Sequence, residues 1–193
     1  MKTYYLQITL KSDTTLGRGE GVPGLVDTEV EHDRYGLPYL RGRTLKGLLA
    51  EECANLLFSL GECGSISEDL YGDLVSAAHS LFGRPGSSLE DDADVHVGDA
   101  QLPADLRAAV RADLISGSYT AHEVLESLTT VRRQTAMDEK GVPDRGSLRS
   151  IRVILRETPL EAALRFDAEP DDRHLTLLAA CAVALRRLGV GRN

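Results

Sequence analysis

The strongest constraint on the fold lies in residues 24–49, GLVDTEVEHDRYGLPYLRGRTLKGLL, where an acidic extended segment leads through a turn into a helix. Leucines recur downstream at the spacing of a single helix face: Leu45, Leu48, Leu49 and Leu56. This spacing predicts a helix over about residues 43–59, with Glu51, Glu52 and Asn55 on its other side. The segment before it alternates at Val26, Thr28 and Val30, which favours an extended conformation.

The predicted helix begins among cations. Arg41, Arg43 and Lys46 lie within six residues, although the macrodipole favours anions at a helix start. Thr44 is expected to cap the amides of the first turn. An external polyanion would explain the cations, because exposed first-turn amides together with Arg and Lys form a phosphate-binding end. We therefore predict that Arg41, Arg43 and Lys46 contact the phosphates of a nucleic acid.

A second basic region lies further along the chain. The formal net charge of -8 alone argues against nucleic-acid binding, yet residues 132–156 hold seven Lys or Arg against three acidic residues. The pattern predicts two strands, at 129–136 and 148–155, with a tip at about 138–146. A two-stranded arm cannot bury a core, so its function is to contact a partner. The predicted contact residues are Arg132, Arg133, Arg149 and Arg152.

The remaining periodicities complete the predicted fold. Strands are expected at residues 3–10, 94–102 and 160–166, and helices at 171–188, after Pro103, near 122–128, and in an acidic insert ending at Leu81. Strand, helix, strand, strand, helix is the order of an α+β, ferredoxin-like (RRM-like) core. We predict one such domain over 1–193, with insertions at about 61–93 and 103–147, a basic β-hairpin, and the last strand missing.

Composition excludes several classes of protein. Three scattered cysteines, Cys53, Cys63 and Cys181, form neither a disulfide framework nor a C-x-x-C zinc motif, which fits a reducing cytoplasm. No apolar run approaches the ~20 residues of a membrane span, so no membrane partner is expected. The chain has no Trp and three Phe, so base stacking on aromatic side chains is not its main binding mode.

The segment GLPYLRGRTLKGLL resembles the G-x-P-x-I-P-G-S-S-L-K-G signature of the RAMP superfamily, the repeat-associated RNA-binding proteins of CRISPR systems. Residues 81–83 (LFG), 95–102 (VHVGDAQL) and 131–138 (VRRQTAMD) are similar to further elements of that family. Three residues replace the usual proline and serines of the signature: Arg41, Arg43 and Thr44.

Within the superfamily, the chain looks most like the backbone subunit of type III effector complexes, because GLVD at 24–27 lies ahead of the GLPYLRG turn. The resemblance implies that Asp27 cleaves target RNA and anchors Mg²⁺ or another divalent metal. It implies guide (CRISPR) RNA, target RNA and other RAMP subunits as partners, with the hairpin as a thumb across the guide. It also makes Gly189, Gly191 and Arg192 the start of a glycine-rich RNA-binding loop that leads to a final strand.

Other interpretations of the same residues remain open. The chain resembles equally a RAMP subunit that is a non-catalytic RNA scaffold. His32 is a candidate general base, and Asp33, followed by Arg-Tyr-Gly, is better explained as a turn residue. A G-x-G-x-x-G pattern over residues 19–24 suggests a small-molecule nucleotide site, but that fingerprint requires a helix directly afterwards, and the sequence predicts none there.

Overall fold

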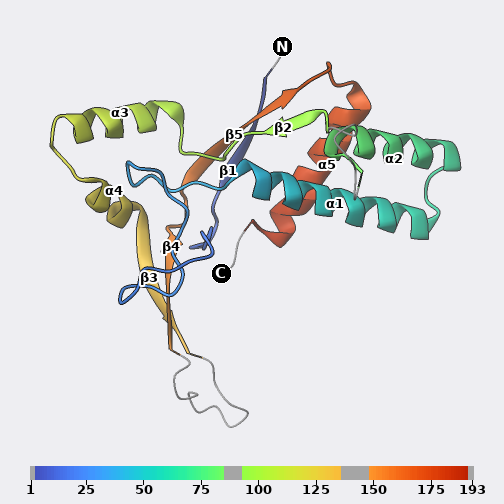
Figure 1. Ribbon diagram of the computed structural model, residues 1–193. Coiled ribbons are helices and arrows are strands. Elements are labelled where there is room, and N and C mark those ends of the chain that lie inside the picture. The colour runs from blue at the N-terminus through green and yellow to red at the C-terminus, as the bar shows by residue number, and fades with distance from the viewer. Residues whose placement is uncertain (1–2, 85–92, 136–147, 191–193) are drawn as a thin grey trace, which may run out of the picture. The chain divides into compact units, whose positions relative to one another are not determined.

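The computed structural model describes residues 3–84, 93–135 and 148–190, which form a mixed α+β structure (Figure 1). The chain divides into two compact units. The first contains Met1–Leu6, Arg41–Asp99 and Ala162–Val190, and the second contains Gln7–Leu40 and Ala100–Glu161. Each unit is built from segments that are distant in the sequence.

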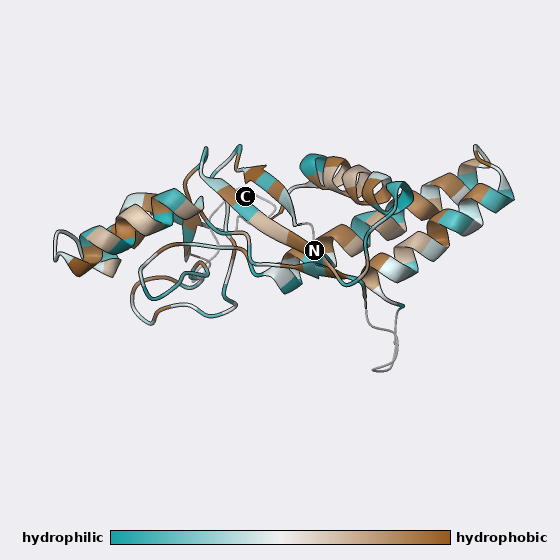
Figure 2. Cartoon of the chain, turned by 90° about the horizontal axis from the view of Figure 1, so that it is seen from above, coloured by the Kyte–Doolittle hydropathy of each residue, from teal (hydrophilic) through white to brown (hydrophobic). Residues whose placement is uncertain are grey.

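Three helices pack on one another in the first unit: α1 (Gly42–Cys63), α2 (Glu68–Phe82) and α5 (Asp172–Leu188). Hydrophobic and hydrophilic residues alternate along them (Figure 2), as expected for helices with one buried face. Side chains from all three form the core: Leu45, Leu49, Cys53, Ala77, Ala78, Leu81, Leu177, Leu178, Cys181 and Leu185.

A three-stranded sheet joins these helices in the order β1-β5-β2, formed by β1 (Tyr4–Thr9), β5 (Pro159–Phe166) and β2 (Val95–Val97). Strand β2 is antiparallel to β5 and pairs Val95 with Phe166. In the first unit, the buried residues Ala162, Leu164 and Phe166 alternate with more exposed neighbours along β5. One face of this strand therefore points into the core.

The second unit contains α3 (Ala104–Ile115), α4 (Ala121–Leu128) and a hairpin of β3 (Thr129–Gln134) and β4 (Arg149–Ile154). A capping box between Thr120 and Glu123 starts α4, and β3 follows this helix directly. Strands β3 and β4 are antiparallel, with Thr129 opposite Ile154 and Gln134 opposite Arg149. Figure 1 shows the two strands extending together from the end of α4.

Most predicted elements are confirmed, with changes at their ends. Helix α1 extends to Cys63 and ends at Gly64, whose φ of 57° is left-handed. The strand predicted at 94–102 is shorter, because β2 ends at Val97 and the chain then forms single bridges at Ala100 and Gln101. The hairpin tip at about 138–146 and the polar loop after Arg84 lie outside the described residues.

Two predictions about α1 were wrong. Thr44 lies inside the helix, where it caps nothing; the N-cap position is Arg41, and its side chain makes no capping hydrogen bond. Glu52 was placed on the outer face, but only 7% of it is exposed. The buried stripe runs through Leu45, Leu49, Glu52 and Cys53, so it is rotated from the predicted one. Among the described residues, no helix combines the length and apolarity needed to cross a bilayer.

Candidate functional site

Asp27 is held at the outer edge of β4 by two hydrogen bonds to one residue. Its amide donates to the Ser150 carbonyl oxygen at 2.7 Å, and its Oδ2 accepts from the Ser150 amide at 2.6 Å. The other carboxylate oxygen, Oδ1, accepts no hydrogen bond from a described residue, and the side chain is exposed. The hairpin thus carries an anchored acid with one oxygen turned to solvent.

The residue after Asp27 continues this pairing. Thr28 forms a parallel bridge with Ile151, and its carbonyl oxygen accepts from the Arg152 amide at 3.0 Å. Residues 27 and 28 therefore line the edge of β4 that β3 leaves open. The extended conformation predicted for 26–30 is confirmed in this form, with bridges at Val26, Thr28 and Val30.

A buried ion pair fixes the same segment. The Glu29 Oε1 atom lies 3.0 Å from the Arg152 Nε atom, and each side chain is only 4% exposed. Arg152 also donates from Nη1 to the Thr129 Oγ1 atom at 3.0 Å, and Glu29 accepts from the Val30 amide at 2.9 Å. The predicted contact of Arg152 with RNA does not fit this burial. Its guanidinium stabilises the unit from within.

The other arginines of the hairpin differ in their surroundings. Arg132 pairs with Asp13 at 2.5 Å. Hydrogen bonds from the Arg156 amide and from Arg132 lower the pKa of Asp13. Arg133 and Arg149 are exposed and form no ion pair with the described residues.

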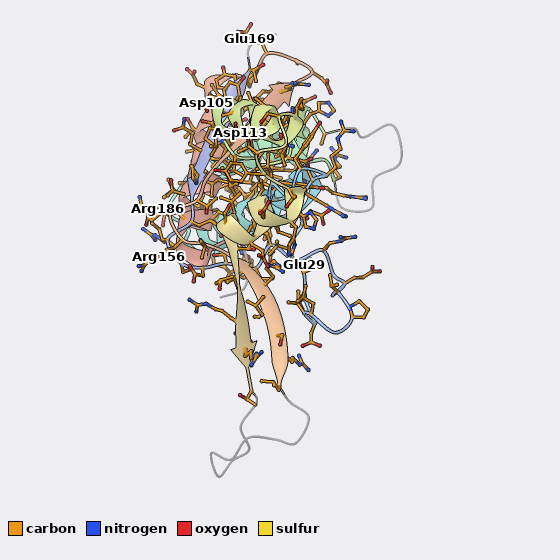
Figure 3. The ribbon with its side chains drawn as sticks, turned by 90° about the vertical axis from the view of Figure 1, so that its left-hand side faces the viewer. Glu29, Asp105, Asp113, Arg156, Glu169 and Arg186 are labelled. Carbon is orange, nitrogen blue, oxygen red and sulfur yellow. The ribbon has the colours of Figure 1, made fainter. Side chains whose placement is uncertain are left out.

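The register sets how close the acid lies to these cations. Arg133 is directly opposite Ser150, the residue that anchors Asp27 from the other edge of β4. Two strand spacings of about 4.8 Å then separate the backbones of Asp27 and Arg133 by roughly 10 Å. Arg149 immediately precedes Ser150 in β4, so its side chain lies on the opposite face of the hairpin from that of Arg133. The acidic segment and the basic arm, far apart in the sequence, therefore meet in one unit. Figure 3 shows Glu29 and Arg156 near the base of this hairpin.

The start of α1 has an unexpected partner in the first unit. The Asp99 Oδ1 atom accepts from the Gly42 amide at 2.7 Å, so a carboxylate of the protein itself caps the helix and complements its dipole. Lys46 donates from Nζ to the Val95 carbonyl oxygen at 2.9 Å. Arg43 is exposed and makes no hydrogen bond or ion pair with a described residue. Arg41 is also exposed, at the N-cap position.

Glycine is required at position 42, because a Cβ atom there would overlap the carbonyl oxygen of Val97. In the same unit, Gly189 ends α5 with a φ of 89°, and its amide donates to the Leu185 carbonyl oxygen at 2.8 Å. Gly191 and Arg192 lie outside the described residues.

The competing interpretations have clear outcomes. Asp33 is confirmed as a turn residue: its Oδ1 accepts from the amides of Tyr35 at 2.8 Å and Leu37 at 3.1 Å. The His32 Nδ1 atom lies 3.0 Å from the Asp33 carbonyl oxygen. The segment over residues 19–24 is followed by a bridge between Val22 and Val26, and no helix begins before Gly42 in the described chain. The dinucleotide fingerprint therefore lacks its structural context.

At this site the protein provides one candidate metal ligand, the carboxylate of Asp27. The described residues contain no group of three His, Cys, Asp or Glu able to hold a metal. Magnesium, however, is commonly bound through one or two carboxylates, with water and substrate phosphates completing the shell. The exposed Asp27 Oδ1 atom fits that mode of binding, and it does not fit a metal held by the protein alone.

Two residues that matter to the site escaped the sequence analysis. Glu29 has its partner 123 positions away, and no local pattern indicates that pairing. Asp99 lies in the VHVGDAQL segment, shortly after the strand residues VHV. An aspartate that follows a strand is a candidate cap for a neighbouring helix, and this was the available signal.

The chain matches the RAMP superfamily over residues 7–193, and it therefore belongs to that superfamily. Solved structures with a similar fold include two of the type III-B Cmr-beta complex, one bound to cognate target RNA and one in the apo state. Each is 12% identical with a TM-score of 0.61, and the match covers 94% of this chain and 88% of the other. No curated protein matches the sequence.

Proposed function

We propose that this protein is a guide-RNA-binding backbone subunit of a CRISPR type III effector complex, in which Asp27 cleaves complementary target RNA. The observation that carries the proposal is the pair of hydrogen bonds between Asp27 and Ser150, at 2.7 and 2.6 Å. They hold a carboxylate with one open oxygen at the edge of an arm that bears Arg133 and Arg149. Family membership and the likeness to a structure bound to cognate target RNA support it.

The chemistry assigned to Asp27 follows from its two oxygens. Oδ2 is occupied by the Ser150 amide, which orients the carboxylate. In one route Oδ1 accepts the proton of a 2′-hydroxyl as this oxygen attacks the scissile phosphate, and the bond from phosphorus to the 5′-oxygen breaks as that oxygen leaves with a proton from water. Arg133 holds a phosphate on one face of the hairpin and Arg149 contacts the RNA on the other, which restricts the strand, so that alignment supplies part of the rate. In the alternative route Oδ1 would hold a Mg²⁺ ion together with RNA phosphates, and the ion would stabilise the charge that develops on the phosphate. One carboxylate cannot hold two metals, so we expect modest rates.

The RNA-binding surface that we propose is smaller than the sequence predicted. It contains Arg133 and Arg149 of the hairpin, and Arg132 when RNA displaces Asp13 from it. In the first unit, Arg41, Arg43 and Lys46 stay as proposed contacts, and so does Gly189. The strand order β1-β5-β2 supports a ferredoxin-like core. In such a core the first strand lies beside the third, and β5 is the third strand of this sheet along the chain. A cytoplasmic location stays a prediction.

A second candidate is a scaffolding subunit without catalysis. Asp27 supports this too, because its hydrogen bonds to Ser150 give the residue a structural role that needs no chemistry.

Cleavage of a complementary RNA by the assembled complex distinguishes the two. Asp27→Asn keeps an oxygen that accepts from the Ser150 amide but removes the charge, and Asp27→Ala removes both. If Asp27 is catalytic, Asp27→Asn lowers the cleavage rate by about 100-fold or more while guide and target binding stay unchanged. Unchanged cleavage with both variants would assign the scaffolding function.

A further inference from the structure

Two guanidinium groups lie over one aromatic ring in the second unit. The Cζ atom of Arg34 is 5.0 Å from the centroid of the Tyr35 ring, and the Cζ atom of Arg111 is 4.8 Å from it. Both distances are within the range of cation–π contact. Arg34 and Tyr35 come from the turn at residues 33–37, and Arg111 comes from α3, so two elements meet at this ring.

The turn that carries the ring is held firmly. Asp33 accepts from the amides of Tyr35 and Leu37 through its Oδ1 atom. Gly36 has a φ of 79°, and a Cβ atom there would overlap the Ala121 carbonyl oxygen at the start of α4. The backbone of the turn therefore lies directly against α4. Tyr35 is presented on a rigid support.

Arg111 is a half-buried cation without an acceptor. Its Nε atom is buried and has no hydrogen-bond partner among the described residues, and its guanidinium forms no ion pair with them. Arg107 lies one helical turn earlier on the same face of α3, where its Nε donates to the Leu102 carbonyl oxygen at 2.9 Å. Like charges at this spacing destabilise a helix slightly, and a buried donor without a partner costs free energy. Such a group calls for an explanation, for example a bound ion.

The nearby carboxylates do not neutralise this cluster of Arg34, Arg107 and Arg111. At about 100° per residue, Asp105 and Asp113 are each roughly 140° away around α3 from the midpoint of Arg107 and Arg111. Both are labelled on this helix in Figure 3. The Asp33 Oδ1 atom accepts from the amides of its own turn, and Asp33 forms no ion pair with a described arginine. Three guanidinium groups thus lack an ion pair among the described residues, in a chain whose formal net charge is -8.

We propose that Arg34, Arg107 and Arg111, supported by Tyr35, form a second RNA contact site that binds backbone phosphates of a single strand. The inference rests on the proposed function, since it assumes that this subunit binds RNA. Guanidinium forks match phosphate oxygens, and stacking on Tyr35 orients them before the anion arrives. The same unit carries the exposed arginines of the hairpin. One strand of RNA is therefore the anion that both arginine groups would share.

The test measures binding of the full chain to a fluorescein-labelled oligouridylate by anisotropy at several salt concentrations. Removing two phosphate contacts in Arg34→Gln/Arg111→Gln lowers the magnitude of the salt slope by about 1.4 and weakens binding about tenfold at low salt. Arg111→Lys keeps the charge and retains the slope. A charge-matched control, Arg165→Gln/Arg173→Gln in the first unit, leaves the slope at the wild-type value. Circular dichroism checks that each variant folds.

The outcomes separate this proposal from the proposed function. If Arg133→Gln/Arg149→Gln weakens RNA binding while Arg34→Gln/Arg111→Gln binds as the wild type does, the second site is wrong and the RNA-binding function stands. Equal losses in the Arg34/Arg111 variant and the control would reduce the effect to net charge and overturn the site. A wild-type chain that does not bind the oligouridylate rejects both. Titrations with inorganic phosphate and with polyglutamate complete the test. If the Arg34/Arg111 variant loses either of these ligands yet keeps RNA, the cluster binds that anion and the RNA assignment fails.

Discussion

Glu29 and Arg152 form a buried ion pair across 123 positions of sequence, with 3.0 Å between Oε1 and Nε. Because Glu29 is two residues beyond Asp27, this pair ties the acidic segment to β4. The ion pair therefore helps to fix the position of the Asp27 Oδ1 atom, the proposed catalytic oxygen. The pair therefore serves the geometry of the site without touching RNA.

Breaking this pair on one side is expected to be costly. Glu29→Gln leaves the Arg152 guanidinium buried without its counter-charge and lowers the free energy of unfolding by about 3 kcal/mol. Urea denaturation measures this, with Glu20→Gln, an exposed position in the same segment, as the matched control. The double variant Glu29→Met/Arg152→Met removes both charges and recovers much of the loss. A single variant as stable as the control would mean that the pair contributes nothing.

Asp13 makes stability depend on acid pH. Hydrogen bonds from the Arg156 amide and from Arg132 lower the pKa of Asp13 in the folded state. Its contribution is therefore complete above the unfolded pKa of about 3.9 and disappears as the pH falls through the lower, folded pKa. Asp13→Asn should cost about 1 kcal/mol near pH 7, and the difference from wild type should shrink below about pH 4. Thermal unfolding at several pH values checks this. A difference that stayed constant down to pH 2 would contradict it.

Asp99 competes with any anion for the start of α1. Asp99→Asn keeps an oxygen that accepts from the Gly42 amide but removes a negative charge beside Arg41 and Arg43. We expect RNA affinity to rise about twofold or more at low salt, with less than 1 kcal/mol of lost stability. Asp99→Ala removes the cap as well and costs about 1 kcal/mol. Anisotropy titration measures the affinity. If Asp99→Asn binds RNA no better than the wild type, the start of α1 does not contact phosphates.

The three thiols are expected to react at different rates. Cys63 is exposed, whereas Cys53 and Cys181 are buried against each other between α1 and α5. Hydrogen bonding to Cys53 and burial raise the pKa of Cys181, which keeps it as the unreactive thiol. An aromatic disulfide reagent should modify one thiol quickly in the native protein and the other two only after unfolding. Cys63→Ser should abolish the fast phase. A fast phase that survives this substitution would place a second thiol at the surface.

Periodic patterns in the sequence predicted the helices and strands whose formation depends on nearby residues. The spacing of Leu45 and Leu49 predicted α1, and the alternation over residues 26–30 predicted the extended segment, because helix and strand periodicities are short-range properties. Two interactions between residues far apart in the sequence could not be predicted in this way. Arg152 meets Glu29, and the cap of α1 comes from Asp99 instead of Thr44. A sequence shows that such groups are charged, but only tertiary structure shows which charges neutralise each other.

Among the described residues, Asp27 forms its hydrogen bonds with the main chain of Ser150, so position 150 should tolerate most side chains. The hydroxyl group at position 150 takes no part in either bond, so alanine or threonine there would leave the carboxylate where it is. Proline would delete the N–H group of residue 150 that binds Oδ2 and release the carboxylate from the arm. Natural variation at this position is thus expected to be wide, with that single exclusion.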